Sequence, residues 1–182
     1  MPRADAVRNR QRVLSAARDA FAELGPGVSL DDVARRAGVG PGTVHRHFPT
    51  KDALFAAVIA DRLEELAAAG AELAGADEPG PAFFGFFRRL AAEAAQNLAL
   101  SAALTDPAAT GEAIREAGRE LEGAIAVLLA RAQEARAVRE DLTTAELHAV
   151  IAGAVVMEQR LPGPSKGRGL QLVVDGLAGK RA

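Results

Sequence analysis

The stretch VARRAGVGPGTVHRHFPTKDALF, residues 33–55, decides the fold of this chain. It holds two apolar helical segments, separated by a corner with glycine at positions 38, 40 and 42. Val44 and Phe48 are four residues apart, so they share one face of a short helix and can anchor it to its neighbours. The other positions of that helix carry polar side chains that a hydrophobic core does not favour. The pattern predicts a helix-turn-helix.

The segments around this stretch show helical periodicity and almost no strand pattern. Five apolar residues lie on one face of a first helix that ends at the breaker Gly25-Pro26-Gly27: Val13, Leu14, Ala17, Phe21 and Leu24. Ser29 and Asp32 form a capping pair at the start of a second helix. Pro41 suits the first turn of the third helix, and Thr50 can cap a fourth that runs to about residue 74.

A second helical region follows the break GADEPGP at residues 75–81. Its predicted helical segments are 83–98, 114–135, 147–159 and 170–177. Asp106-Pro107 signals a helix start, and Thr143 with Glu146 forms a capping box before residue 147. The sequence therefore predicts an all-α fold with two regions.

Composition narrows the function classes. The 182 residues include no Cys, which excludes disulfides, Cys-based zinc sites and a thiol nucleophile. The charged N-terminus does not resemble a signal peptide and no uninterrupted apolar run reaches about 18 residues, so we expect a soluble cytoplasmic protein without a membrane partner. Net charge is -2, yet residues 1–60 hold nine Lys/Arg and six Asp/Glu. The first third is the basic part of the chain.

The polar face of the third helix carries groups suited to nucleic acid. The second helix of a helix-turn-helix can lie in the DNA major groove. Thr43 offers a hydroxyl to a phosphate or base edge, and the Arg46 guanidinium matches guanine O6 and N7. Glycine at 40 and 42 leaves the backbone free to approach closely. Lys51 and the N-terminal N–H groups of the fourth helix can hold a phosphate.

Residues 13–58 resemble the DNA-binding domain of the TetR family of bacterial transcriptional regulators. The matching segments are VLSAARDAFAELG (13–25), SLDDVARRAGV (29–39) and GPGTVHRHFPTKDALF (40–55). The resemblance implies a helix-turn-helix DNA-binding domain at residues 1–50 and a helical regulatory and dimerisation domain at residues 51–182. The second region agrees with the general plan of the family but carries no signature of its own.

Taken position by position, the resemblance predicts the DNA contacts. Eight candidates follow: Ser29, Pro41, Gly42, Thr43, His45, Arg46, His47 and Lys51. His47 and Lys51 fall on the histidine and lysine with which the family usually contacts phosphates. His45 replaces the tyrosine most common in the family, and imidazole has a shorter reach than a phenol. Arginines 8, 10 and 12 are further candidates for backbone or minor-groove contact, or belong to a frayed, solvated N-terminus.

The resemblance also implies a ligand-responsive regulator that is not an enzyme and needs no cofactor. It predicts a repressor that binds a palindromic double-stranded DNA operator as a homodimer and is released by a largely apolar small molecule. In the family, the last two long helices pair across the two-fold axis. Nine apolar residues here suit either that pairing or the interior of a monomer: Leu147, Val150, Ile151, Ala154, Val155, Leu170, Val173, Val174 and Leu177.

A Phe-rich helix suggests where such a ligand binds. Phe83, Phe84, Phe86 and Phe87 cover about 160° of a helix, and Asn97 falls within the same arc. His148 lies at the edge of another apolar face. Aromatic side chains with a few polar groups are typical of a pocket for an apolar ligand. Ordinary core packing is the alternative.

Three other interpretations compete with the regulator. An enzyme acting on a hydrophobic substrate needs an acid/base pair or nucleophile, and no catalytic motif surrounds His148. A helical module that binds protein would use its apolar faces and respond little to salt. A metal site at His45 and His47 is disfavoured, because residues two apart point about 200° apart on a helix. We expect no metal.

Overall fold

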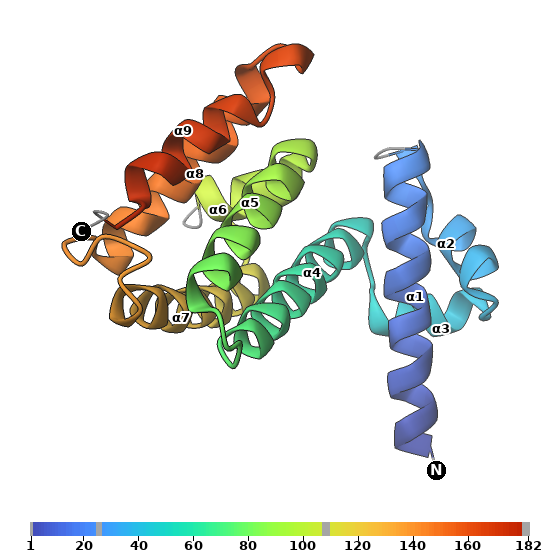
Figure 1. Cartoon of the computed structure of the whole chain (residues 1–182). Coiled ribbons are helices and arrows are strands. Elements are labelled where there is room, and N and C mark those ends of the chain that lie inside the picture. Colours follow the sequence, from blue (N-terminus) through green and yellow to red (C-terminus); the bar gives the residue numbers. More distant parts are fainter. Residues whose placement is uncertain (1, 25–26, 107–109, 180–182) are drawn as a thin grey trace. The chain divides into compact units, whose positions relative to one another are not determined.

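The computed structural model describes residues 2–24, 27–106 and 110–179. Within these ranges the regular secondary structure is helical, with one isolated antiparallel bridge between Val138 and Ala178 (Figure 1). The predicted all-α fold is confirmed. The chain divides into two compact units, Met1–Arg62 and Leu63–Ala182, so α4 (Lys51–Leu73) begins in one and ends in the other. The predicted functional division after residue 50 lies immediately before this helix and stays a prediction.

The first unit contains α1 (Pro2–Leu24), α2 (Leu30–Ala37), α3 (Pro41–His47) and the start of α4. α1 packs against α2, and α2 packs against α3. One hydrophobic cluster joins all four helices: Val13, Leu14, Ala17, Ala20, Val28, Val33, Ala34, Ala37, Val44, Phe48, Leu54 and Val58. Because α2 and α3 are only one or two turns long, this shared core rather than helix propensity holds them in place.

The predicted helix boundaries in this unit are confirmed by their caps. Ser29 Oγ accepts a hydrogen bond from the Asp32 N–H at 3.1 Å, and Asp32 Oδ2 accepts one from the Ser29 N–H at 3.2 Å. Thr50 Oγ1 accepts from the Ala53 N–H at 3.1 Å at the start of α4. Leu24 is a correction: its side chain is 59% exposed, so it does not join the buried face of α1. Residues 25 and 26 of the predicted breaker lie outside the described ranges.

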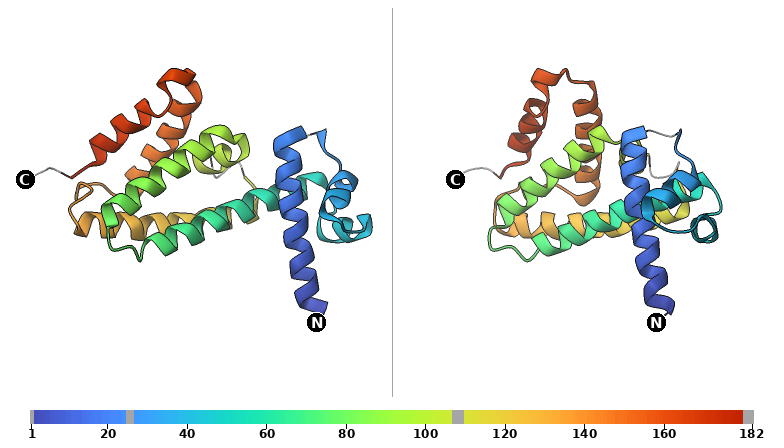
Figure 2. Two further views of the ribbon diagram at one scale, coloured as in Figure 1. Left: turned by 45° about the vertical axis from the view of Figure 1, so that its right-hand side comes forward. Right: turned by 90° about the vertical axis from the view of Figure 1, so that its right-hand side faces the viewer.

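The second unit contains the rest of α4 and the remaining helices (Figure 2). These are α5 (Pro79–Gln96), α6 (Leu98–Thr105), α7 (Glu112–Glu134), α8 (Thr144–Arg160), a short 3-10 helix η3 (Gly163–Ser165) and α9 (Arg168–Leu177). α5 is its central helix, since it packs against α6, α7, α8 and α9. Within the described ranges, none of the helices is both long and apolar enough to cross a bilayer.

Two predicted boundaries in the second unit are wrong and one is confirmed. The segment 83–98 is not one element, because Asn97 has extended backbone and its side chain accepts from the N–H groups of Ala99 and Leu100, which starts α6. Asp106 ends α6 instead of starting the next helix, and Pro107 lies outside the described residues. The Thr143–Glu146 capping box opens α8 as expected.

Candidate functional site

α3 is held by its apolar side and exposes its polar side. Val44 and Phe48 are fully or almost fully buried. His45, Arg46 and His47 are exposed, and Thr43 is half-buried at the edge. The helix begins at Pro41, which needs no N–H partner there, and ends where the Phe48 N–H donates to the Val44 carbonyl oxygen at 2.8 Å. The predicted arrangement of anchors and polar face is therefore present.

The corner between α2 and α3 depends on a left-handed glycine. Gly38 has φ 63°, a conformation that costs other residues energy, and the Val39 N–H donates to the Ala34 carbonyl oxygen at 3.1 Å. Arg12 of α1 donates from Nη2 to the Gly38 carbonyl oxygen at 3.3 Å. A Cβ added to Gly40 or Gly42 would meet no atom within 4 Å, so the backbone at both positions faces open space. A partner can approach closely at these two positions.

Two polar side chains of α3 have contacts of their own. Arg46 donates from Nε to the Gly42 carbonyl oxygen at 2.9 Å. This bond orients the guanidinium and leaves its terminal nitrogens without a hydrogen bond to the described part of the chain. His45 Nε2 lies 3.5 Å from Asp31 Oδ1 of α2. A phosphate contact by His45 therefore competes with a carboxylate on the neighbouring helix.

The N-terminal arginines belong to an ordered helix. Arg8 pairs with Asp5 one turn away on α1, and the Arg10 guanidinium lies 5.8 Å from the centre of the Phe48 ring. Together with Arg12 at the corner, Arg10 brings cationic groups of α1 to both ends of α3. From the sequence, these arginines were candidates for backbone or minor-groove contact or part of a frayed N-terminus, because their proximity to α3 depends on how α1 packs.

The other candidates border the same surface. Pro41 and Gly42 are exposed at the start of α3, and Lys51 is half-buried at the first position of α4. Ser29 is exposed, but its hydroxyl already serves the capping box of α2. Hydrogen bonds from the Ser29 hydroxyl, and next from its N–H, lower the pKa of Asp32. The structure thus brings seven of the eight candidates together around α3 and α4 and gives Ser29 a clear structural role.

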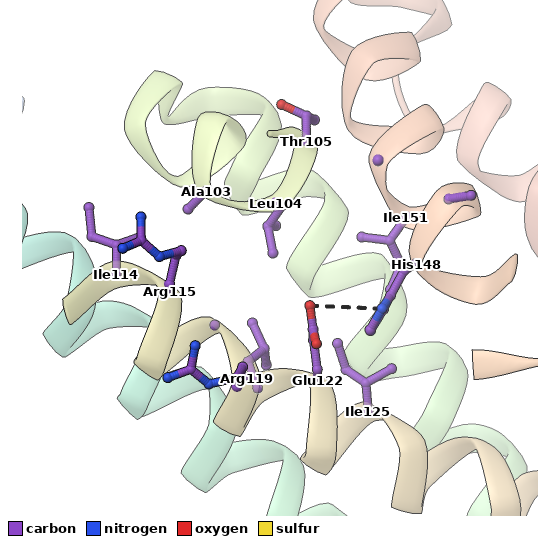
Figure 3. A pocket seen from close by; sticks show the side chains of 14 residues that line it. Ala103, Leu104, Thr105, Ile114, Arg115, Arg119, Glu122, Ile125, His148 and Ile151 are labelled. Atoms are coloured by element: carbon purple, nitrogen blue, oxygen red, sulfur yellow. Dashed lines mark ion pairs between the residues drawn. The ribbon is translucent and has the colours of Figure 1, made fainter. Parts of the chain in front are cut away.

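The second unit contains a cavity of about 430 Å³ between α6, α7 and α8. Its walls are largely apolar, with Leu104, Ile125 and Ile151 among the lining side chains (Figure 3). Four charged or titratable side chains also line it: Arg115, Arg119, Glu122 and His148. A volume of this size with few polar groups is typical of a small-molecule site.

Most of the sequence-based ligand candidates lie elsewhere. Phe83, Phe86 and Phe87 are buried in the core, where they border only a void of about 10 Å³. Phe84 is half-buried beside the Arg88 guanidinium, 6.0 Å from its ring centre. Asn97 is exposed and caps α6. Of the six candidates, His148 is the one that lines the large cavity.

Sequence reasoning missed the α7 side of this cavity. Ile114, Gly118 and Ile125 lie on one face of the predicted helical segment 114–135, and all three line the cavity. A signal was present: Arg115 and Arg119 are four residues apart beside that face, and glycine leaves space within it. Among the described residues, no group of three His, Cys, Asp or Glu side chains could hold a metal ion.

Comparisons with known proteins agree with both units. Residues 13–58 match the family "Bacterial regulatory proteins, tetR family", and residues 78–179 match "Transcriptional regulator SbtR-like, C-terminal domain". The crystal structure of the TetR transcription regulatory protein from Mycobacterium vanbaalenii is 39% identical, with a TM-score of 0.74, over 98% of this chain and 99% of that chain.

Two curated relatives match a smaller part of the chain. The uncharacterized HTH-type transcriptional regulator TtgW of Pseudomonas putida is 42% identical over 64 residues, 35% of this chain and 48% of that protein. The HTH-type transcriptional repressor Rv3405c of Mycobacterium tuberculosis is 52% identical over 48 residues, 26% of each chain. The matches thus span less than half the length of these curated relatives. Because family profiles match in both units and one solved relative aligns along nearly the whole chain, this chain belongs to the TetR family of DNA-binding transcriptional regulators.

Proposed function

We propose that this chain is a repressor that binds a palindromic operator as a homodimer and is released by a small molecule. The observation that carries the proposal is the exposed polar face of α3, whose other face is held in the core of the first unit by Val44 and Phe48. A helix that the core already holds in place presents its side chains to the major groove without the cost of ordering its backbone. The shared segment of the mycobacterial relative, a repressor, supports the direction of regulation.

The residues around α3 have separate roles in this proposal. Arg46 reads a guanine with the terminal nitrogens that its bond to Gly42 leaves available. Thr43 contacts a base edge or a phosphate from the rim of the helix. His47 and Lys51, with the free N–H groups at the start of α4, hold the DNA backbone. Pro41 and Gly42 allow the backbone of α3 to approach the duplex.

Dimerisation supplies a second half-site, because one helix reads too few base pairs to distinguish an operator from a genome. Within the chain, Leu147, Ile151, Leu170 and Val174 are buried, so these residues already serve the interior of the second unit. The outer side of the last helices remains available. Leu172 of α9 is 68% exposed, and Gly153 and Val156 lie in line on the exposed side of α8. We assign the dimer contact to this outer side.

The response to a ligand follows from two states of the dimer. An effector in the cavity releases DNA only if it binds more tightly to a state whose recognition helices do not fit the operator. α4 is the covalent link through which such a change passes, since it belongs to both units. Binding suits the cavity better than catalysis. Thr105 lines the cavity, and its hydroxyl donates to the Ser101 carbonyl oxygen at 2.8 Å instead of to a catalytic base.

Selection of bound sites from random DNA tests the proposal and yields the operator. We expect an inverted repeat with half-sites one helical turn apart, or a multiple of it. Arg46→Ala should then relax base preference at one position per half-site, whereas Lys51→Ala should weaken all sequences alike and flatten the dependence on salt. Arg89→Ala, an exposed position on α5, is the matched control. If Arg46→Ala and Lys51→Ala both kept wild-type affinity and specificity, α3 would not be the reading helix.

A further inference from the structure

We infer that the effector is a small amphipathic organic anion, with its acidic group at Arg115 and Arg119 and its apolar body against Leu104, Ile125 and Ile151. This inference rests on the proposed ligand response and adds the chemical class of the ligand. It comes from the unequal distribution of charge along the cavity: Arg115 and Arg119 lie together on α7, and Glu122 of α7 lies beside His148 of α8 (Figure 3).

The cationic end has two guanidinium groups for one carboxylate. Arg115 and Arg119 are four residues apart, so they lie on the same side of α7. Both pair with Glu112: Arg115 Nη2 lies 2.5 Å from Oε2, and Arg119 Nη2 lies 3.7 Å from Oε1. Hydrogen bonding from Arg115, and next its charge, lowers the pKa of Glu112. Glu112 is therefore engaged chiefly by Arg115.

Arg119 keeps most of its binding capacity. Its separation from Glu112 exceeds hydrogen-bond distance, and its side chain is 60% exposed. Guanidinium presents five donors in a planar fork that matches a carboxylate or sulfonate, and such bonds are about twice as strong as neutral ones. An acidic group that enters this end of the cavity meets a solvent-accessible guanidinium, held only loosely by Glu112 at 3.7 Å, together with the second charge of Arg115.

The opposite end disfavours an anion. Glu122 Oε1 lies 3.9 Å from His148 Nδ1, and Glu122 is one turn of α7 beyond Arg119 (Figure 3). The Glu122 carboxylate repels the acidic group of a ligand at this end, so an anionic ligand binds with that group at the arginines. Nε2 of His148 is buried and has no hydrogen-bond partner among the described residues. His148 Nε2 is thus a buried polar atom available for a hydrogen bond at this end, and a hydroxyl or other donor group on the ligand could supply that bond.

Two fluorescent probes that differ by one group test the inference on the full-length protein. 8-Anilino-1-naphthalenesulfonate carries an anionic sulfonate, and N-phenyl-1-naphthylamine has the same rings without it. We expect the sulfonate to bind at least about tenfold more tightly, and Arg119→Gln to remove about tenfold of that affinity while binding of the neutral probe stays constant. Arg89→Gln, outside the cavity, should change neither.

A cavity-filling variant identifies the binding site. Gly118 lines the cavity, and a Cβ added there meets no atom within 4 Å, so Gly118→Leu should place its side chain in the cavity and abolish binding of both probes. Gly123→Leu, on the same helix but outside this cavity, is the control. The inference is overturned if Gly118→Leu leaves sulfonate binding intact, or if Arg119→Gln weakens the two probes equally. Operator release is measured separately: charge-selective binding without release would refute the ligand response and support the anion site.

Discussion

α3 and α5 are the two helices from which the sequence predicted function, and they differ in how many neighbours they have. α3 buries one side through Val44 and the adjoining Phe48, so its other residues remain at the surface. α5 packs against four helices and buries Phe83, Phe86 and Phe87 in doing so. An exposed polar face can be predicted from the sequence of one helix. A wide apolar arc can either line a ligand pocket or pack in the core, and the sequence does not distinguish the two.

The cavity of the second unit does not lie along the apolar arc of α5. Large aromatic side chains fill space, and the void beside the phenylalanines is only about 10 Å³. The large cavity lies where small residues face one another across three helices: Ala103, Gly118, Ala149 and Ala152. Interiors are close-packed, so a cavity forms where side chains are too small to meet. Small residues beside charged ones were the better indication of a cavity with polar groups in its wall.

The largest expected effect comes from deleting one buried phenylalanine ring from the core of each unit. Phe48→Ala and Phe86→Ala both delete a buried ring, and each should lower the free energy of unfolding of its unit by about 3–5 kcal/mol. Amide hydrogen exchange resolves the two units separately. Phe48→Ala should deprotect α2 and α3, and Phe86→Ala should deprotect α5.

Phe55→Ala is the control, since that ring is 40% exposed and should cost much less. Equal loss of protection in both units from either change would contradict the division into two cores.

A smaller effect tests the corner before α3. Gly38→Ala forces a residue with a Cβ into φ 63°, so it should cost about 1–2 kcal/mol in unfolding free energy, measured by chemical denaturation. The added Cβ would also lie 2.8 Å from Arg12 Nη2, which can move aside. Gly40→Ala is the matched control, because φ there is −68° and the Cβ position is open. A similar cost for both would show that the left-handed corner is unimportant.

The smallest expected effect concerns acid sensitivity, for which each unit has one capping box. The hydroxyl and then the N–H of Ser29 lower the pKa of Asp32, and the N–H and then the hydroxyl of Thr143 lower the pKa of Glu146. A carboxylate with a lowered folded-state pKa stabilises the protein above its ordinary pKa, here 3.8 and 4.5, and loses that contribution as pH falls.

Asp32→Asn and Glu146→Gln should therefore each flatten the decline in stability below about pH 4.5, seen by denaturation across a pH series. Glu120→Gln, on the exposed face of α7, serves as control. Unchanged acid profiles in both variants would mean that the caps do not contribute through charge.

Local signals explain which parts of the site could be predicted. Ser29, Gly38 and Pro41 each act within a few residues of their own position, so the ends of α2 and the start of α3 follow from the sequence. Asn97 also acts locally, but its cap was hidden inside a helical pattern that runs on across it without a glycine or proline. The positions of Arg10 and Arg12 beside α3 depend on contacts with residues far along the chain, Phe48 and Gly38, which no local pattern encodes.

The sequence by itself determined the helical class, the helix-turn-helix and the polar residues that α3 exposes, because periodicity and capping act over one or two turns. Only the tertiary structure decided that the phenylalanines of α5 are core, that α6 is separate, and that Arg115, Arg119, Glu122 and His148 share a cavity. The physical reason is that a cavity is the space several packed helices leave unfilled. Its shape depends on side chains from distant segments at once.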